Sequence, residues 1–209
     1  MKLVSSSRCQ RTLLLRQVFI LKSCVDRSLK SGVGQVKAGV RVTVSAKYVP
    51  RLHVILWHPE IPPNTGNIGR SCVAVGAKLW LVRPLGFDIS EKQLRRAGLD
   101  YWQHLEWEAV DSLDEIRAKI PEPFEQQRVW LFTKFGQSRY SDVTYEQGDV
   151  LLFGCESAGL PEEIVSQFPS SAKLRLPMRP QVRSLNLSSS ATAAMYEVIR
   201  QIGTPEDAF

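Results

Sequence analysis

Three segments of the sequence carry side chains whose types and spacing could bind a ligand or take part in catalysis. The first is PPNTGNIGR at 62–70. Asn64 and Gly66 are turn formers, and Arg70 falls one turn into the helix expected to follow, where its guanidinium could point back at the loop. Taken alone, this segment is equally compatible with an ordinary strand–turn–helix connection and a solvated arginine.

The second segment is LFGCESAGLP at 152–161, in which a glycine directly follows an apolar strand. Gly154 and Gly159 would let the backbone approach a ligand closely. Glu156 could accept hydrogen bonds from a ligand or from backbone donors, or pair with a cation. The spacing lacks the middle glycine of G-x-G-x-x-G, and no G-x-x-x-x-G-K-[ST] occurs, so a Rossmann dinucleotide site and a P-loop are excluded.

The third segment is LRLPMRPQVRSLNLSSS at 174–190, an extended loop that leads into the last helix. Backbone N–H groups at that helix start could hold an anion or a carboxylate. The capping candidates are Ser184, Ser188, Ser189 and Ser190, and simple capping is the alternative interpretation of the segment. A serine hydrolase is disfavoured because no G-x-S-x-G occurs and neither His58 nor His104 has an evident Ser or Asp partner.

The elements that must position these segments alternate between strands and helices. The expected strands are 52–57, 78–84, 128–134, 149–154 and 172–178, with 104–110 as an edge strand. The expected helices are 67–77, 90–98, 112–120, 160–168 and 187–202, and 59–66 is expected to be a loop. This order predicts an α/β fold with a mostly parallel sheet flanked by helices, and the three segments should follow the carboxyl ends of strands.

The last predicted helix has a continuous apolar face. Its members at helical spacing are Leu187, Ala191, Ala194, Met195, Val198 and Ile202. Such a face predicts packing of this helix against the rest of the fold or against a second copy of the chain.

Charge is divided unevenly along the 209 residues. The whole chain is +6, but residues 1–50 contain ten basic residues and one acidic residue, a net +9, which leaves −3 for 51–209. The segment 1–47 is rich in Arg and Ser, which predicts a transit peptide for a plastid or a mitochondrion ahead of one domain at 48–209. A disordered basic tail that helps to bind RNA, in a cytoplasmic protein, is the alternative.

Metal and membrane binding are not expected. The four cysteines show no metal-ligand spacing, and the chain has only three histidines. Cys72 and Cys155 lie in apolar surroundings and are expected to be buried free thiols. No apolar stretch reaches the roughly 18 residues that a transmembrane helix needs.

The three segments resemble the three motifs of the SPOUT superfamily of RNA 2′-O-ribose methyltransferases. The matching patterns are N-x-G-x-x-x-R (Asn64, Gly66, Arg70), F-G-x-E-x-x-G-L-P (Phe153 to Pro161) and S-L-N-x-S (Ser184 to Ser188), in that order. RRAGLDYW at 95–102 and PEIPPNTGN at 59–67 are similar to the TrmL type, which methylates wobble nucleotide 34 of tRNA. The resemblance covers about 52–203.

The resemblance implies a C-terminal trefoil knot over 128–203 and S-adenosylmethionine as the cofactor. The implied cofactor contacts are Phe132, Thr133, Gly154, Gly159, Leu176, Met178, Ser184 and Leu185. Because a sulfonium already makes its methyl group electrophilic, the protein has only to align the ribose 2′-oxygen and help to remove its proton.

The resemblance also implies four catalytic residues, of which Arg70 would lie at the reacting ribose. A guanidinium gives up its proton only at great cost, so we expect Arg70 to hold the adjacent phosphate and polarise the 2′-hydroxyl rather than act as a general base. Asn64 and Asn186 would orient the Arg70 loop and the helix start, and Glu156 would brace Arg70 or loop amides. All four could instead be structural members of the knot.

The implied partners are the anticodon stem-loop of a tRNA, carrying cytidine or a uridine at position 34, and a second copy of the chain. Because the body is −3, RNA binding must use a local patch. The candidates are Arg70, Lys92, Arg95, Arg96, Lys134, Arg175, Arg179 and Arg183. An rRNA methyltransferase of the same fold and a non-catalytic RNA-binding protein are the alternatives.

Overall fold

The structure is a computed structural model that describes residues 49–88 and 100–203. Two sequence-based predictions, the N-terminal segment 1–47 and the helix 90–98, lie outside these residues, as do the candidate RNA contacts Lys92, Arg95 and Arg96. The described residues belong to one compact unit, which spans 47–209. The predicted α/β class is confirmed.

Within the described residues, seven strands form one sheet in the order β3-β2-β1-β6-β4-β7-β5, and every pair is parallel. The strands are β1 (Leu52–Trp57), β2 (Ala77–Val82), β3 (Trp107–Val110), β4 (Val129–Phe132), β5 (Ser138–Arg139), β6 (Val150–Phe153) and β7 (Lys173–Arg175). Residues such as those of VLLF in β6 are buried on both faces, as parallel strands covered by helices require.

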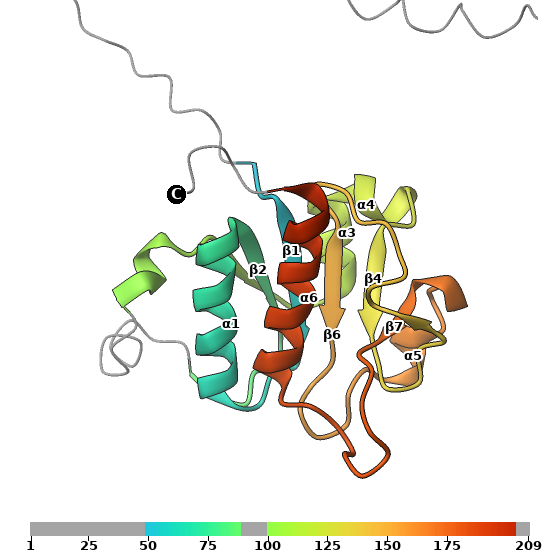
Figure 1. Ribbon diagram of the computed structural model, residues 1–209. Coiled ribbons are helices and arrows are strands. Elements are labelled where there is room, and N and C mark those ends of the chain that lie inside the picture. The colour runs from blue at the N-terminus through green and yellow to red at the C-terminus, as the bar shows by residue number, and fades with distance from the viewer. Residues whose placement is uncertain (1–48, 89–99, 204–209) are drawn as a thin grey trace, which may run out of the picture. The chain divides into compact units, whose positions relative to one another are not determined.

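Helices cover both faces of the sheet (Figure 1). They are α1 (Pro62–Val75), α3 (Leu113–Lys119), α4 (Pro121–Glu125), α5 (Glu162–Val165) and α6 (Leu187–Ile202), with 3-10 turns η1 (Asp100–His104) and η2 (Ser170–Ala172). Alternate residues of β1 point to opposite faces. Leu56 packs in the core beneath α1 and α6, whereas Ile55 packs in the core beneath α3 and α5.

The predicted apolar face of the last helix is buried inside the chain. Ala191, Ala194, Met195 and Val198 are fully buried, and α6 packs against α1 and β6. In Figure 1 the two helices lie side by side in front of the sheet. The helix bounds 187–202 are confirmed, and its apolar stripe belongs to the core.

The largest error of the sequence-based assignment concerns the start of α1. The predicted loop 59–66 is wrong in its second half, because the helix begins at Pro62 with proline in its first turn, where a missing N–H leaves no helical hydrogen bond unmade. Asn64 and Gly66 are therefore buried helical residues, and Arg70 lies two turns into the helix. Gly76 ends α1 in the left-handed conformation, with φ 70°, as predicted.

The chain crosses over itself near the end of β7. Because β7 lies between β4 and β5, the 133–137 connection that joins those two strands must pass over it. Thr133 N–H donates to the Leu174 carbonyl at 2.9 Å. A Cβ at Gly136 would lie 2.5 Å from the Leu174 carbonyl carbon, so only glycine allows this close crossing.

Candidate active site

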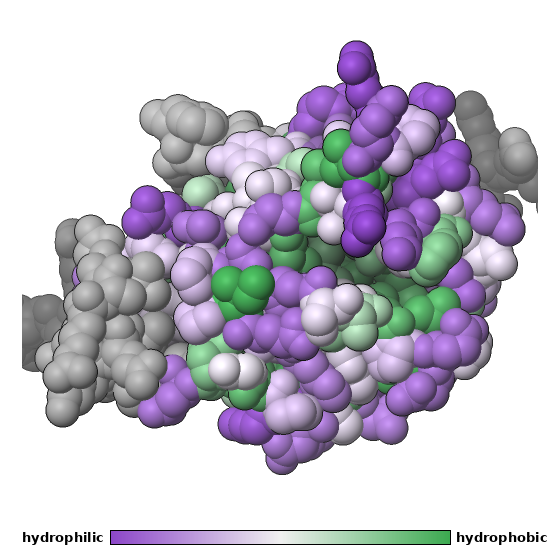
Figure 2. Space-filling model, turned by 90° about the horizontal axis from the view of Figure 1, so that it is seen from below, coloured by the Kyte–Doolittle hydropathy of each residue, from purple (hydrophilic) through white to green (hydrophobic). Residues whose placement is uncertain are grey.

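The three chemistry-bearing segments meet at the carboxyl edge of the sheet. Register brings the strand ends level, because Phe153 of β6 pairs with Leu56 of β1 and with Phe132 of β4. Viewed onto this edge, the molecule has a hollow lined by hydrophobic residues and framed by hydrophilic side chains (Figure 2). This edge is where parallel α/β sheets place their ligands.

Glu156 joins the loop after β6 to the loop after β1. Its carboxylate accepts hydrogen bonds from the backbone N–H groups of Glu60 at 2.8 Å and Ile61 at 3.3 Å, and from Asn64 Nδ2 at 3.0 Å. Of the two roles predicted for this side chain, it takes the bracing of loop amides. No contact joins it to Arg70 within the described residues.

Asn64 and Asn186 extend this hydrogen-bonded chain to the start of α6. Asn186 Nδ2 donates to Asn64 Oδ1 at 2.9 Å, although the two residues are 122 positions apart. Asn64 is 5% exposed, and its Oδ1 and Nδ2 both have partners, so its position is fixed from both sides. Three predicted residues, Asn64, Glu156 and Asn186, thus form one connected group.

The predicted caps and anion site at the start of α6 are corrected. Asn186 is the N-cap, and its Oδ1 accepts from the N–H groups of Ser188 at 2.9 Å and Ser189 at 3.3 Å. Ser190 N–H bonds to the Asn186 carbonyl. The N–H groups of Ser188, Ser189 and Ser190 thus already have acceptors within the chain and are not free to bind an anion. The predicted caps Ser184, Ser188, Ser189 and Ser190 do not cap the helix.

Glu60 and Ser157 are site residues that the sequence did not reveal. Ser157 donates to the Glu60 carboxylate through its N–H at 2.9 Å and its hydroxyl at 2.7 Å. The two loops therefore hold each other in both directions: the Glu60 backbone donates to the Glu156 carboxylate, and the Ser157 backbone donates to the Glu60 carboxylate. The signal available was the acid of HPEIPP, three residues after the end of an apolar strand, but its partner lies 97 residues away.

The glycines of the second segment shape the loop itself. Cys155 and Gly159 exchange backbone hydrogen bonds at 3.2 and 3.0 Å, which folds the loop back on itself. A Cβ at Gly154 would lie 2.1 Å from the Gly159 carbonyl carbon, and Gly159 has φ 76°. Glycine at 154 is therefore required by the chain's own backbone, whereas the sequence had suggested approach of a ligand.

Arg70 lies apart from the hydrogen-bonded group, on the exposed side of α1. Its guanidinium carbon lies 4.7 Å from the centroid of the Tyr101 ring, and the Tyr101 hydroxyl donates to the Gly66 carbonyl at 2.7 Å. The side chain lines an open groove of about 620 Å³ whose other wall is the first half of α6. Tyr101, not Glu156, is the residue that braces Arg70.

The residues predicted to contact a cofactor follow β4, β6 and β7 at the same edge. Phe132 is buried and stacks on Phe153, with ring centroids 4.6 Å apart, so its side chain belongs to the core. Thr133, Leu176 and Met178 are half-buried, and Ser184 and Leu185 are exposed. The chain therefore offers apolar side chains and loop backbone at this edge, the kinds of group that a nucleoside site uses.

Across 49–88 and 100–203, no group of three or more His, Cys, Asp and Glu residues could hold a metal ion. Burial, followed by the charge of Lys78, lowers the pKa of His53 to about 4, and its Nδ1 accepts from Trp80 Nε1. Burial raises the pKa of the Cys72 thiol, while Cys155, predicted to be buried, is only half-buried.

None of the helices described is long and apolar enough to cross a membrane.

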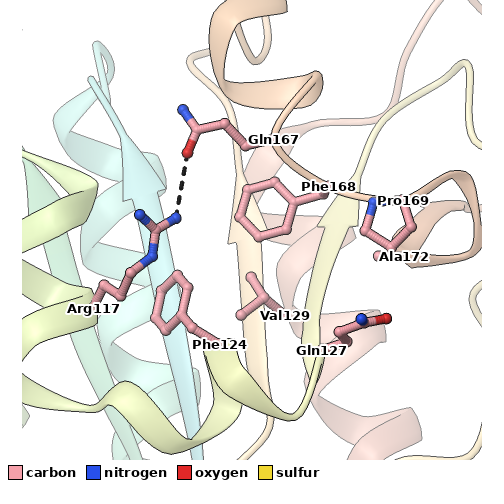
Figure 3. Close-up of a pocket in the computed structure, with 8 residues that line it drawn as sticks. All are labelled: Arg117, Phe124, Gln127, Val129, Gln167, Phe168, Pro169 and Ala172. Atoms are coloured by element: carbon pink, nitrogen blue, oxygen red, sulfur yellow. Dashed lines mark hydrogen bonds between the residues drawn. The ribbon is translucent and has the colours of Figure 1, made fainter.

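A smaller cavity of about 250 Å³ lies on the other side of the sheet (Figure 3). It is lined by Arg117, Phe124, Gln127, Val129, Gln167, Phe168, Pro169 and Ala172. Arg117 pairs with Asp114 at 2.7 Å, donates to Gln167 and lies over the Phe124 ring. Its charge is satisfied within the chain, and none of the motif residues lines this cavity.

Known proteins share this fold and these segments. The model of the SpoU rRNA Methylase family matches residues 51–196. A tRNA (cytidine(34)-2'-O)-methyltransferase of Methylovorus glucosotrophus is 45% identical over 148 residues, covering 71% of this chain and 94% of that protein. A solved structure concerned with the 2-OH methylation of C/U34 on tRNA is 44% identical, with a TM-score of 0.64, over 72% of this chain and 89% of its own.

A more distant structure shows the cofactor of a related protein. The SpoU methyltransferase AviRb from Streptomyces viridochromogenes, solved in complex with AdoMet, is 26% identical, with a TM-score of 0.61, over 71% of this chain and 57% of its own. The resemblance inferred from three motifs is thereby confirmed. From the sheet, the motif segments joined at its carboxyl edge and these matches, we conclude that the chain belongs to the SpoU methylase family.

Proposed function

We propose that this protein transfers a methyl group from S-adenosylmethionine to the ribose 2′-hydroxyl of nucleotide 34 in a tRNA. The observation that carries the proposal is the hydrogen-bonded chain Glu156–Asn64–Asn186, which joins the three motif segments at one edge. Relatives about 45% identical, matched over nearly their whole length, are named for this reaction.

Each part of the site then has a distinct task. Bound S-adenosylmethionine supplies an electrophilic methyl group. The loops after β4, β6 and β7 hold and orient it, with Leu176 among the apolar walls. The Glu156–Asn64–Asn186 group fixes α1 relative to α6, and Arg70 projects from α1 to hold the phosphate beside the target ribose and polarise its 2′-hydroxyl.

The test is methyl transfer by the full chain to tRNA, with the modified nucleotide mapped. We expect transfer to an unmodified tRNA and none to the same tRNA carrying a 2′-deoxy nucleotide at position 34, since that substrate lacks only the accepting oxygen. Transfer to rRNA instead would favour the rRNA methyltransferase alternative. Saturable cofactor binding without transfer to either RNA would favour a non-catalytic protein.

We infer that the C-terminal part, 128–203, forms a trefoil knot. The strand order and the passage of the 133–137 connection over β7 support this, as does the close approach of Gly136 to Leu174. In such a knot the cofactor loops would be held by topology as well as by hydrogen bonds.

We propose further that two copies associate through the groove between α1 and α6. Its walls include Ser189, Thr192, Ala193 and Tyr196. The Tyr196 side chain is 53% exposed and could bury a large area against a second copy of the chain. Arg70 lines the same groove, so association would bring a partner's residues to the reacting ribose.

A charge in that groove should separate the copies. We expect light scattering to give about twice the monomer mass for the native chain and the monomer mass for Tyr196→Glu, because a buried unpaired carboxylate opposes association. Gln147→Glu adds the same charge on an exposed loop away from the groove and should remain dimeric. A strictly monomeric and fully active native protein would contradict this proposal.

We also propose that residues 1–47 direct the protein to a plastid or a mitochondrion. The excess of ten bases over one acid in 1–50 supports this, and so does the family match, which begins only at residue 51. A chain starting at Tyr48 should retain the melting temperature and methyl transfer of the full chain. Loss of soluble fold in the shortened chain, or a cytosolic location of the full chain fused to a fluorescent protein, would contradict the proposal.

A further inference from the structure

Phe135 has the largest exposed fraction of any large hydrophobic side chain in the described residues, 80%. It lies in the turn after β4, at the carboxyl edge of the sheet that carries the candidate site. An aromatic ring left in solvent does not gain the favourable free energy of burial. A ring exposed in this way beside a candidate binding site therefore indicates a contact with a ligand or partner.

The turn that carries Phe135 is firmly fixed to the sheet. Thr133 Oγ1 accepts from the Phe135 N–H at 3.3 Å, and the Thr133 carbonyl accepts from the Gly136 N–H at 3.2 Å. The Thr133 N–H in turn bonds to Leu174 of β7. The backbone on both sides of Phe135 is therefore held in place, and its ring is presented outward without support from the core.

The surface around this turn is strongly basic. The 133–141 segment contains two basic residues and no acid, and the 173–186 segment contains four basic residues and no acid. Strands β5 and β7 bring the two segments together, with Arg139 directly opposite Arg175. The six basic residues are Lys134, Arg139, Lys173, Arg175, Arg179 and Arg183.

In the described part of the chain, these six charges lack ion-pair partners. Among the residues that the structure describes, none of the six forms an ion pair with a carboxylate, although residues 51–209 as a whole carry −3. The Lys134 ammonium lies 5.0 Å from the centroid of the Phe135 ring. A flat exposed ring among unpaired cations matches the two parts of a single-stranded nucleic acid, which are stackable bases and phosphates.

Resting on the proposed function, we propose that Phe135 stacks on an unpaired base of the RNA substrate next to the target nucleotide. Lys134 and the arginines of β5, β7 and the loop after β7 contact the phosphates on either side. The surface made by 133–141 and 173–186 is thus a single-strand binding surface, continuous with the site through the turn after β4. Phe135 is a positioning residue, because it holds the RNA and does not touch the reacting atoms.

The test compares three substitutions of Phe135 in the full chain. For Phe135→Ala we expect the Kd for an anticodon stem-loop to rise about five- to a hundredfold, the effect of losing one stacked base. Phe135→Leu, which keeps apolar bulk without a ring face, should be nearly as weak, and Phe135→Tyr should restore binding. Val49→Ala removes another exposed apolar side chain, outside this surface, and should bind RNA as the native chain does.

Two further readouts separate stacking from charge and from cofactor binding. Phe135→Ala should leave the slope of log Kd against log salt unchanged, whereas Arg175→Ala should reduce it by about one counterion. Affinity for S-adenosylmethionine, measured by calorimetry, should stay within about twofold for Phe135→Ala.

Two outcomes would overturn the assignment while the native chain still methylates tRNA. One is native RNA affinity in Phe135→Ala or Phe135→Leu. The other is a loss of cofactor affinity in Phe135→Ala that accounts for the loss of activity. If the native chain itself transfers no methyl group to tRNA, the proposed function fails, and the stem-loop affinities of the same variants still decide whether Phe135 stacks on RNA.

Discussion

Replacing Arg70 by alanine should reduce methyl transfer about a hundredfold or more, while the affinity for S-adenosylmethionine stays within a few-fold. The guanidinium lies over the Tyr101 ring and lines the open groove, and within the described residues no hydrogen bond or ion pair joins it to the loops assigned to the cofactor. Loss of a charge-assisted contact to a reacting group removes about 3 kcal/mol of transition-state stabilisation and leaves ground-state cofactor binding intact. Single-turnover transfer rates and calorimetry on the same protein measure the two quantities.

Two further variants define the role of Arg70. Arg70→Lys keeps the charge but loses the planar fork, so we expect an intermediate rate. The pH–rate profile of Arg70→Ala should keep the native shape, because a residue that holds a phosphate, unlike a general base, takes part in no proton transfer. Arg117→Ala also removes an arginine from an aromatic ring, but on the other side of the sheet, and should transfer at the native rate. A native rate in Arg70→Ala would refute the active-site assignment.

The second large effect is expected from Gly154→Ala. The new methyl group would lie 2.1 Å from the Gly159 carbonyl carbon and 2.3 Å from the Leu160 nitrogen, both of them backbone atoms that no rotamer change can move. The loop after β6 must open, and we expect a loss of at least about 3 kcal/mol in the free energy of unfolding. Cofactor affinity should fall with it.

Gly159→Ala is the matched control in the same loop. A Cβ there meets no atom within 4 Å, so the substitution adds only the strain of a left-handed alanine, about 1–2 kcal/mol. Urea unfolding of both variants, with calorimetry of S-adenosylmethionine binding, should rank Gly154→Ala well below Gly159→Ala. Equal stability of the two variants would show that opening the loop costs little free energy, and that its closed conformation does not contribute to the stability of the fold.

Periodicity and composition predicted six of the seven strands described and the last helix, because both signals are local, whereas the two-residue strand β5 (Ser138–Arg139) is too short to give such a signal. A buried parallel strand such as β1 is a continuous apolar run, and α6 has a complete apolar stripe. The predicted start of α1 was wrong because PPNTG has the composition of a turn, whereas in the folded chain Asn64 and Gly66 are buried helical residues, held by contacts with Asn186 and Tyr101. Tertiary packing decided that boundary, and local propensity did not.

The candidate site was predictable to the extent that its residues belong to motifs. Asn64, Glu156 and Asn186 were named from sequence and are hydrogen-bonded to one another. The pairing of Glu60 with Ser157 arises only when two loops meet, so no spacing along the chain reveals it. The support of Arg70 by the Tyr101 ring is likewise a contact of the folded state.

The strand order has a consequence for when this protein becomes active during its synthesis. Strand β6 enters between β1 and β4, and β7 enters between β4 and β5, so each fills a gap between strands that precede it in the chain. Asn186, the N-cap of α6 and the partner of Asn64, follows 122 residues later. Contacts of such long range form late and slowly. A growing chain that has produced the Arg70 helix, but not the segment from Asn186 onward, therefore lacks part of the candidate site, and we expect it to bind neither cofactor nor RNA productively until that segment has been made.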